Sequence, residues 1–219
     1  MRKGFYIIGT NTDIGKTYIS ALLCKKLLQE GVDTFYYKPV VSGADSIEKS
    51  DIGYVFDIAN IRHDISFASS YIFKNAYSPH LASAQENSTI SFEKIMNDYN
   101  KARTIADFLV VESCGGIVCP ISYDNNIIMQ EDLVKAFNLD VVLVVDSKLG
   151  TINHTTLTIE YLKKLGINII GVIMNNYEDE LYINDNIYMI EKLNNVKVIA
   201  KVKQFDNEIN INIQDLLEV

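Results

Sequence analysis

The chain is poor in cysteine, and the cysteines that it has form no metal-binding or redox pattern. Its 219 residues contain 3 cysteines, which are Cys24, Cys114 and Cys119. Their number is odd and their spacing matches neither a zinc site nor a thioredoxin-type pair. Free thiols in a reducing compartment are the simplest interpretation. Cys24 falls on the apolar face of a helical pattern, so we expect it in the core.

The chain also lacks an excess of positive charge and any long apolar run. It carries 20 Lys and Arg against 28 Asp and Glu, which gives a formal net charge of −8. We therefore expect no non-specific binding to nucleic acid or to a membrane surface. No apolar stretch approaches the ~18 residues of a membrane span, and the first apolar run is too short for a signal peptide. We expect a soluble, cytoplasmic protein.

No linker rich in Pro, Gly or Ser and no internal repeat divides the chain, so we expect a single domain over residues 1–219. Residues 44–86 are less regular, and we expect them to form a loop-rich wall of a substrate site. The tail at residues 205–219 is too short for a second domain. Apolar residues make up 48% of the chain, which is typical of a globular protein.

Apolar runs typical of strands alternate with helical patterns along almost the whole chain. The expected strands are residues 5–8, 34–38, 108–112, 141–146, 167–175 and 196–202, and the expected helices are residues 17–30, 91–106, 151–165 and 181–193. Several runs are continuously apolar, as in parallel strands that are covered on both faces. Gly31 and Gly166 follow two of the helices at C-cap positions. The alternation predicts a doubly wound, mostly parallel α/β fold with ligands at the carboxyl ends of the strands.

The most informative motif lies at residues 9–17, which read GTNTDIGKT. An apolar run precedes it and a helical pattern follows, an order that is typical of a P-loop. Backbone N–H groups and the helix N-terminus would bind phosphate, Lys16 would reach the β- and γ-phosphates, and Thr17 would ligate Mg²⁺. The usual pattern has glycine where Thr10 stands, and Gly9 is one residue early, so the loop is a variant. The alternative is a tight turn that ends in Gly-Lys-Thr by chance.

Three charged residues follow the P-loop at places where chemistry is expected. Lys38 ends the second strand and can neutralise phosphoryl charge; the alternative is an exposed lysine before a proline turn. Glu112 ends the third strand before two glycines, where it can ligate a metal beside a phosphate; the alternative is a capping or loop acid. Asp51 starts a helix after Ser50 and can be a metal ligand or a simple first-turn acid. With Thr17, these two acids form a plausible hard-oxygen set for Mg²⁺.

Amide side chains follow two later strands. Asn175 and Asn176 can pair with the edge of an adenine base, because an amide offers a donor and an acceptor. Turn residues are the alternative, and the same alternative applies to Asn153 and His154.

Taken together, these segments resemble dethiobiotin synthetase. The similar segments, each with the family's motif, are residues 9–17 (G-T-x-T-x-x-G-K-T), 38–43 (K-P-V-x-S-G), 50–51 (S-D), 78–86 (S-P-H with A-Q-E), 111–120 (V-E-G-A-G-G with a proline) and 148–154 (K-L-G-x-I-N-H). Two segments depart from the family. Ser113-Cys114 replaces Gly-Ala, and residues 200–204, AKVKQ, stand where the family often has G-x-I-P.

The resemblance implies a ligase that uses ATP and Mg²⁺. One amine of 7,8-diaminopelargonic acid takes up CO₂ to form a carbamate, which attacks the γ-phosphate of MgATP. The resulting carbamic–phosphoric anhydride is attacked by the second amine, which closes the ureido ring of dethiobiotin. ADP and phosphate are released.

The resemblance also implies roles for individual residues. Lys16 and Lys38 would be catalytic, and Thr17, Asp51 and Glu112 would hold Mg²⁺. ATP would be bound by Asp13, Ile14, Gly15, Lys16, Thr17, Tyr18, Asp51, Glu112, Ser113, Cys114, Gly115, Asn175 and Asn176. The substrate would be bound by Thr12, Ser42, Gly150, Thr151, Asn153 and Tyr188. The last four are expected to reach the substrate carboxylate from a neighbouring subunit, which implies a homodimer with active sites at its interface.

Three other functions fit parts of the sequence. A partitioning or septum-positioning ATPase would carry a second lysine early in the loop, where this chain has Asn11. An amidation enzyme of the cobyrinic-acid type would need a glutaminase domain, for which the chain has no room. A nucleotide-binding module without chemistry of its own is the third alternative.

Overall fold

The apolar strands of the chain form a central parallel sheet. The computed structural model describes residues 4–124 and 127–217. The order of strands in the sheet is β10-β9-β8-β1-β5-β2, and each neighbouring pair is parallel. The strands are β1 (Gly4–Gly9), β2 (Thr34–Tyr37), β5 (Phe108–Glu112), β8 (Asp140–Asp146), β9 (Ile169–Asn175) and β10 (Val198–Lys201). The expected strands are all present, with small differences at their ends.

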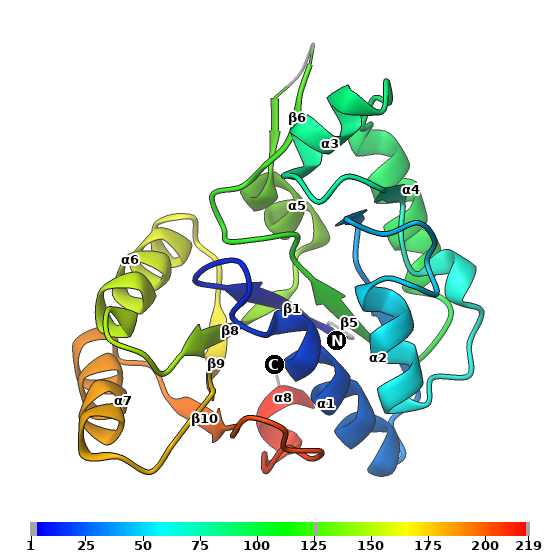
Figure 1. Cartoon of the computed structure of the whole chain (residues 1–219). Helices are drawn as coiled ribbons and strands as arrows, with labels where there is room; N and C mark the ends of the chain where they lie inside the picture. The colour runs from blue at the N-terminus through cyan, green and yellow to red at the C-terminus, as the bar shows by residue number, and fades with distance from the viewer. Residues whose placement is uncertain (1–3, 125–126, 218–219) are drawn as a thin grey trace.

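Helices cover both sides of this sheet (Figure 1). They are α1 (Lys16–Gln29), α2 (Asp51–Ala59), α3 (Pro79–Gln85), α4 (Phe92–Ala102), α5 (Gln130–Phe137), α6 (Thr151–Lys164), α7 (Leu181–Asn194) and α8 (Gln214–Leu217). Helix α1 packs against α2, and α6 packs against α7. Because connections between parallel strands are right-handed, α1 lies on the face opposite to α4, α5, α6 and α7. The doubly wound fold expected from the sequence is confirmed.

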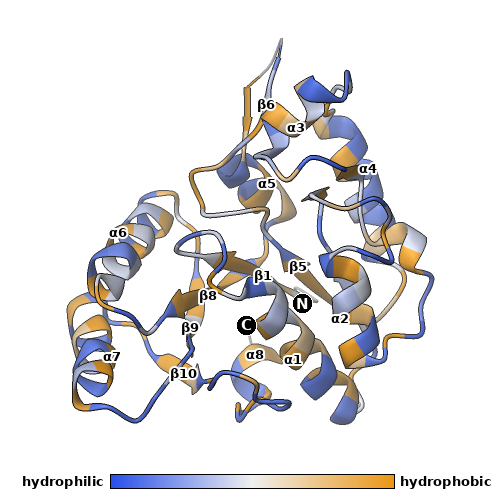
Figure 2. Cartoon of the chain, viewed as in Figure 1, coloured by the Kyte–Doolittle hydropathy of each residue, from blue (hydrophilic) through white to orange (hydrophobic). Residues whose placement is uncertain are grey.

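The core lies between these layers. Residues such as Tyr6, Ile7, Val142 and Val144 are fully buried on the central strands, as expected for a sheet that is covered on both faces. Figure 2 shows the same pattern, with apolar strands in the middle of the molecule and polar outer faces on the helices. Cys24 is fully buried, so its expected core position is confirmed.

Several short elements were not expected from the sequence. Residues 44–86 contain α2, whose start at Asp51 was expected, and also α3, the 3-10 turn η1 (Ile65–Phe67) and β4 (Tyr71–Phe73), which pairs with β3 (Val40–Ser42). Loops join these short elements, so the region is loop-rich but holds more regular structure than its sequence indicates. Strand β6 (Pro120–Tyr123) forms an antiparallel pair with β7 (Ile127–Met129), directly before α5. These elements are short, and α5 begins after Met129, which gives no sequence signal of a helix start.

The ends of two long helices follow expectation. Gly31 and Gly166 adopt the left-handed φ values of 80° and 72° directly after α1 and α6. The tail after β10 packs on the main body through Ile209, Ile211 and Leu216, which are buried. None of the helices within residues 4–124 and 127–217 has the length and apolarity that a membrane span requires.

Candidate functional site

A cleft of about 1230 Å³ opens where β1, β2 and β5 end. Doubly wound sheets bind ligands at this edge, and the volume is larger than that of an ordinary small-molecule pocket. The lining includes the glycine-rich loop, the start of α1 and the ends of β2 and β5. In full it consists of residues 10–13, 15–18, 38, 40–44, 49–51, 54, 76–79, 112, 114–120 and 158. Residues between 44 and 79 therefore form one wall, as the sequence indicates.

The glycine-rich loop joins β1 to α1 in the expected order. Helix α1 begins at Lys16, and Gly15 precedes it with a φ of 88°. A Cβ at Gly15 would lie 2.2 Å from the side-chain nitrogen of Asn175, so no other residue fits there without a shift. The Lys16 ammonium is buried and donates to the carbonyl oxygen of Asn11 at 3.0 Å. The alternative of a chance turn is disfavoured, because the strand, the loop, the lysine and the helix follow one another as in a P-loop.

The pKa of Lys16 lies below its ordinary value. Burial is the main cause, and the nearby Lys38 adds to it, while Glu112 works in the opposite direction. An ammonium that is buried without a carboxylate in hydrogen-bond contact has capacity for an anion. The loop thus offers a positive charge, on Lys16, that a bound phosphate can neutralise.

Glu112 is the most heavily bonded side chain of the site. It is fully buried and accepts four hydrogen bonds. Thr17 and Lys38 donate to Oε1 at 2.8 and 2.7 Å, and Ser20 and Tyr36 donate to Oε2 at 2.6 and 2.8 Å. Burial by itself raises the pKa of Glu112, but Lys38 and the hydrogen bonds outweigh it and hold the pKa below its ordinary value. Glu112 is therefore charged, and its interpretation as a loop acid is wrong.

Lys38 bridges the two acids of the site. Its Nζ lies 2.5 Å from Asp51 Oδ2 and 2.7 Å from Glu112 Oε1. Burial lowers the pKa of Lys38, but Glu112 and Asp51 more than offset this and raise the pKa above its ordinary value. The interpretation of Lys38 as an exposed lysine is wrong. Asp51 stands in the first turn of α2, as expected, where Ser50 accepts from the N–H of Ile52. Its role as a metal ligand stays a prediction.

The proposed metal ligands converge on one point. Oxygens of Asp51 and Glu112 lie around Lys38 Nζ, and the Thr17 hydroxyl contacts the same Glu112 oxygen. Hydroxyl and carboxylate oxygens are the donors that Mg²⁺ prefers. The described part of the chain holds no group of three or more His, Cys, Asp or Glu that could bind a metal ion. The set fits a magnesium ion that takes its remaining ligands from phosphate and water.

Other expected residues lie in or near the cleft. Thr12, Ser42 and Cys114 line it, and so does Tyr18, whose hydroxyl donates to the backbone oxygens of Lys203 and Asp206. Cys114 donates to the oxygen of Val40 at 3.2 Å. Burial raises the pKa of the Cys114 thiol to about 12, so the side chain is neutral.

Asp13 and Gly115 also line the cleft, whereas Ile14 and Ser113 are buried beneath it. Ser113 donates to the backbone oxygen of Gly115 at 2.7 Å. The extra bulk of serine, relative to the family's glycine, is thus packed inside the protein.

Asn175 lies beside the glycine-rich loop, and Asn176 lies beside the end of β8. Asn175 donates to the oxygen of Ile14 at 2.8 Å, and Asn176 donates to Asp146 Oδ1 at 3.2 Å. Asn176 has a left-handed φ of 54°, as a turn residue would. Asn175 is buried, so it is more than a turn residue.

The residues expected to act across a subunit boundary lie apart from the cleft lining of this chain. Gly150 and Thr151 start α6, Asn153 is exposed in its first turn, and Tyr188 is exposed on α7. Within the described residues, none of the four lines the cleft, although Thr158 of the same helix α6 does.

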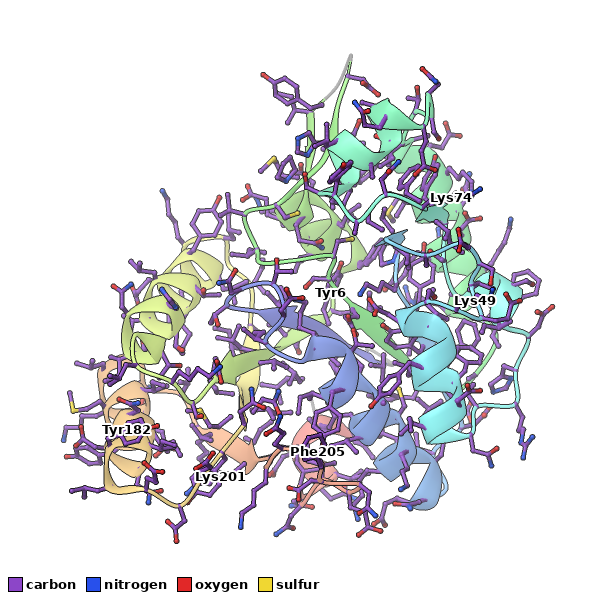
Figure 3. All side chains as sticks on the ribbon, in the orientation of Figure 1. Tyr6, Lys49, Lys74, Tyr182, Lys201 and Phe205 are labelled. Atoms are coloured by element: carbon purple, nitrogen blue, oxygen red, sulfur yellow. The ribbon has the colours of Figure 1, made fainter. Side chains whose placement is uncertain are left out.

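Sequence reasoning missed the residues that support Glu112 from the side. Tyr36 stands two residues before Lys38, which directly follows β2, so an extended chain places their side chains on one face, and Ser20 stands one helical turn after Thr17. Both signals are present in the sequence. Lys49 was missed as well; it lines the cleft beside α2, where Figure 3 shows it.

A variant P-loop at the edge of a parallel sheet, with a lysine and an acid at neighbouring strand ends and a second acid at the start of α2, defines the class of P-loop nucleotide-binding proteins. Solved structures support the fold. A ParA family ATPase from Chlorobium tepidum matches with a TM-score of 0.58 and 16% identity, over 94% of this chain and 87% of that one. A chain of the MinC:MinD cell division protein complex of Aquifex aeolicus matches with a TM-score of 0.55 and 14% identity, over 92% of this chain and 81% of that one.

Sequence comparison is more specific. A family model described as an AAA domain matches residues 3–209. A protein from Clostridium perfringens, named ATP-dependent dethiobiotin synthetase BioD, is 44% identical over 100% of this chain and 98% of its own length. A protein of the same name from Clostridium botulinum is 42% identical over 99% and 97%. The chain belongs to the family of ATP-dependent dethiobiotin synthetases.

Proposed function

We propose that the protein forms dethiobiotin from 7,8-diaminopelargonic acid, CO₂ and MgATP. The observation that carries this proposal is the placement of Lys38, between Glu112 and Asp51 and beside the P-loop, in a cleft larger than an ordinary small-molecule pocket. Identity of 44% with a dethiobiotin synthetase over its whole length supports it independently.

The reaction needs positioning and charge neutralisation more than a protein nucleophile. A carbamate oxygen attacks the γ-phosphorus and ADP leaves; the second amine then attacks the carbonyl carbon and phosphate leaves. Lys16 and Lys38 would offset the charge on the transferring phosphoryl group and the carbamate. Thr17, Asp51 and Glu112 would hold Mg²⁺, which neutralises charge on the phosphate oxygens when bound.

Two buried polar atoms support the ligand assignments. Ser42 Oγ, in the cleft wall, and Asn175 Oδ1, beside the P-loop, are buried and find no hydrogen-bond partner among the described residues. Such atoms are costly unless a ligand or water satisfies them. Ser42 would donate to the carbamate or accept from an amine of the substrate, as would the nearby Thr12. Asn175 would accept from the amino group of adenine.

A homodimer with active sites at its interface forms part of the proposal. Leu149, Leu157, Leu181 and Tyr188 are more than half exposed on or beside α6 and α7, and apolar side chains gathered in this way favour a protein contact. Thr158 of α6 lines the cleft, so a second subunit on this helix would lie next to the site. Asn153, at the exposed start of α6, would then meet the substrate carboxylate of the partner's site.

We also propose that the enzyme works in the cytoplasm, because all 3 cysteines are free thiols. A switch ATPase is the alternative that the fold permits. The fold neighbours share only 14–16% identity with this chain, and Asn11 stands where such ATPases carry a second lysine.

The test is ADP release with MgATP and bicarbonate, with and without 7,8-diaminopelargonic acid, followed by mass analysis of the product. We expect turnover that depends on the diamine and yields dethiobiotin. ATP hydrolysis that ignores the diamine would overturn the proposal in favour of a switch ATPase.

A further inference from the structure

Two of the three proposed metal ligands, Asp51 and Glu112, hold a cation that belongs to the protein itself. Lys38 Nζ contacts Asp51 Oδ2 at 2.5 Å and Glu112 Oε1 at 2.7 Å. Thr17 Oγ1 donates to that same Glu112 oxygen at 2.8 Å. The ammonium therefore occupies one oxygen of each of the two carboxylates that a divalent cation would need.

Burial makes this ammonium the main counter-charge of the acid pair. The side chains of Lys38 and Glu112 are 8% and 0% exposed, while that of Asp51 is 47% exposed. A buried carboxylate is strongly unfavourable without a partner. The other lysine in the cleft floor, Lys16, donates to a backbone oxygen of the P-loop instead.

An ammonium and a divalent cation compete for the same two carboxylate oxygens, because they repel each other strongly at such distances. Mg²⁺ also gives up its water reluctantly and prefers sites that supply phosphate oxygens. No three acidic or metal-binding side chains cluster in the described residues, so the protein offers Mg²⁺ only two carboxylates and a hydroxyl there. Free Mg²⁺ therefore has little to gain by displacing Lys38.

We propose that Lys38 occupies the cation position while the nucleotide is absent, so that a divalent cation binds only together with nucleotide phosphates. The phosphates would supply ligands to the metal and new acceptors to Lys38, whose ammonium then turns from Asp51 toward the transferring phosphoryl group. Lys38 would thus impose the order of binding as well as neutralise charge. This inference rests on the magnesium set of the proposed function.

The test measures Mn²⁺ binding without nucleotide, by the electron paramagnetic resonance signal of free Mn²⁺. The wild type should show no saturable site at submillimolar Mn²⁺, and an ATP analogue that is not hydrolysed should create one. Lys38→Met keeps the length of the side chain and removes its charge. It should bind one Mn²⁺ per chain without nucleotide, about tenfold or more tightly than the wild type.

Two controls locate the effect. Lys49→Met removes another positive charge from the cleft wall, at an exposed residue beside α2 (Figure 3). It should leave the nucleotide-free protein without a Mn²⁺ site. The double variant K38M/E112Q should lose the site that K38M gains. Equal gains in Lys49→Met and Lys38→Met would overturn the inference, since they would indicate a general charge effect.

If Lys38→Met does not fold, Mn²⁺ binding by the wild type alone still tests the inference. Saturable Mn²⁺ binding by the nucleotide-free wild type, as tight as in the presence of the analogue, would overturn it. The assay involves no turnover, so its outcome is independent of whether the protein makes dethiobiotin.

Discussion

Asn175, the last residue of β9, donates its side-chain amide to the backbone oxygen of Ile14 at 2.8 Å. This hydrogen bond connects the end of β9, which is distant in the sequence, to the middle of the P-loop. The same amide nitrogen excludes any Cβ at residue 15, where the backbone is also left-handed. The shape of the phosphate-binding loop therefore depends on a residue far along the chain.

Replacing Asn175 with Asp should weaken both the fold and nucleotide binding. The carboxylate keeps the shape of the side chain but cannot donate to Ile14, whose oxygen loses its partner. We expect a loss of roughly 1–3 kcal/mol in the free energy of unfolding and a higher Kd for ATP. Urea unfolding and calorimetric titration measure the two effects. Asn100→Asp, at an exposed position of α4, is the control; an ATP affinity equal to that of this control would contradict the role of Asn175.

Lys16→Ala should abolish measurable dethiobiotin formation. The ammonium is proposed to stabilise the transferring phosphoryl group, and loss of such a charge lowers kcat by on the order of 10²–10³-fold or more. Lys26→Ala is the matched control on the same helix, since Lys26 only pairs with Glu30 near the surface. Steady-state kinetics of both variants decide the matter, and a near-normal kcat for Lys16→Ala would remove the residue from the catalytic set.

Glu112→Gln should shift the magnesium dependence of the reaction. A neutral amide is a weaker ligand for Mg²⁺ than a carboxylate, so half-maximal activity should need a higher Mg²⁺ concentration. The measurement is a magnesium titration at saturating ATP, with circular dichroism to show that the variant is folded. Glu30→Gln, a change at an exposed residue directly after the far end of α1, should behave as the wild type. A titration that coincides with the wild type would exclude Glu112 as a ligand.

Much of the fold could be predicted because its strands are continuous apolar runs. The run at residues 141–145 admits few structures other than a strand covered on both faces, and it lies in β8. Lys38 and Glu112 could be singled out because strand ends of a parallel sheet meet at one edge, and Asp51 because it follows Ser50 at a helix start. Their convergence within hydrogen-bond distance is in agreement with that reasoning.

What could not be predicted depends on contacts between distant residues or on short elements. Tyr36 and Ser20 stabilise Glu112 from 76 and 92 positions away, and no local pattern shows which acid a buried hydroxyl will meet. Helices α3 and α5 have seven and eight residues. Segments of that length are specified mostly by packing, and too few apolar positions repeat in them to reveal a helical period.

Asn153→Ala should raise the KM for 7,8-diaminopelargonic acid more than the KM for ATP. Asn153 is exposed at the start of α6 and away from the cleft of its own chain, so its proposed contact is with the substrate carboxylate in a partner's site. Glu160→Ala, exposed on the same helix, is the control. Equal increases in both KM values would count against a site shared between subunits.

The stability of the protein should fall in acid partly because of Glu112. Burial opposes its charge, but Lys38 and the hydroxyl donors hold the folded-state pKa below the ordinary glutamate value. The unfolded chain therefore takes up this proton first as the pH falls. The contribution of Glu112 is fully present above the ordinary glutamate pKa and disappears as the pH falls through the folded-state pKa. Free energies of unfolding measured from neutral to acid pH should thus differ most between wild type and Glu112→Gln at neutral pH. The difference should shrink in acid, whereas one that is independent of pH would mean that Glu112 is not held ionised by its partners.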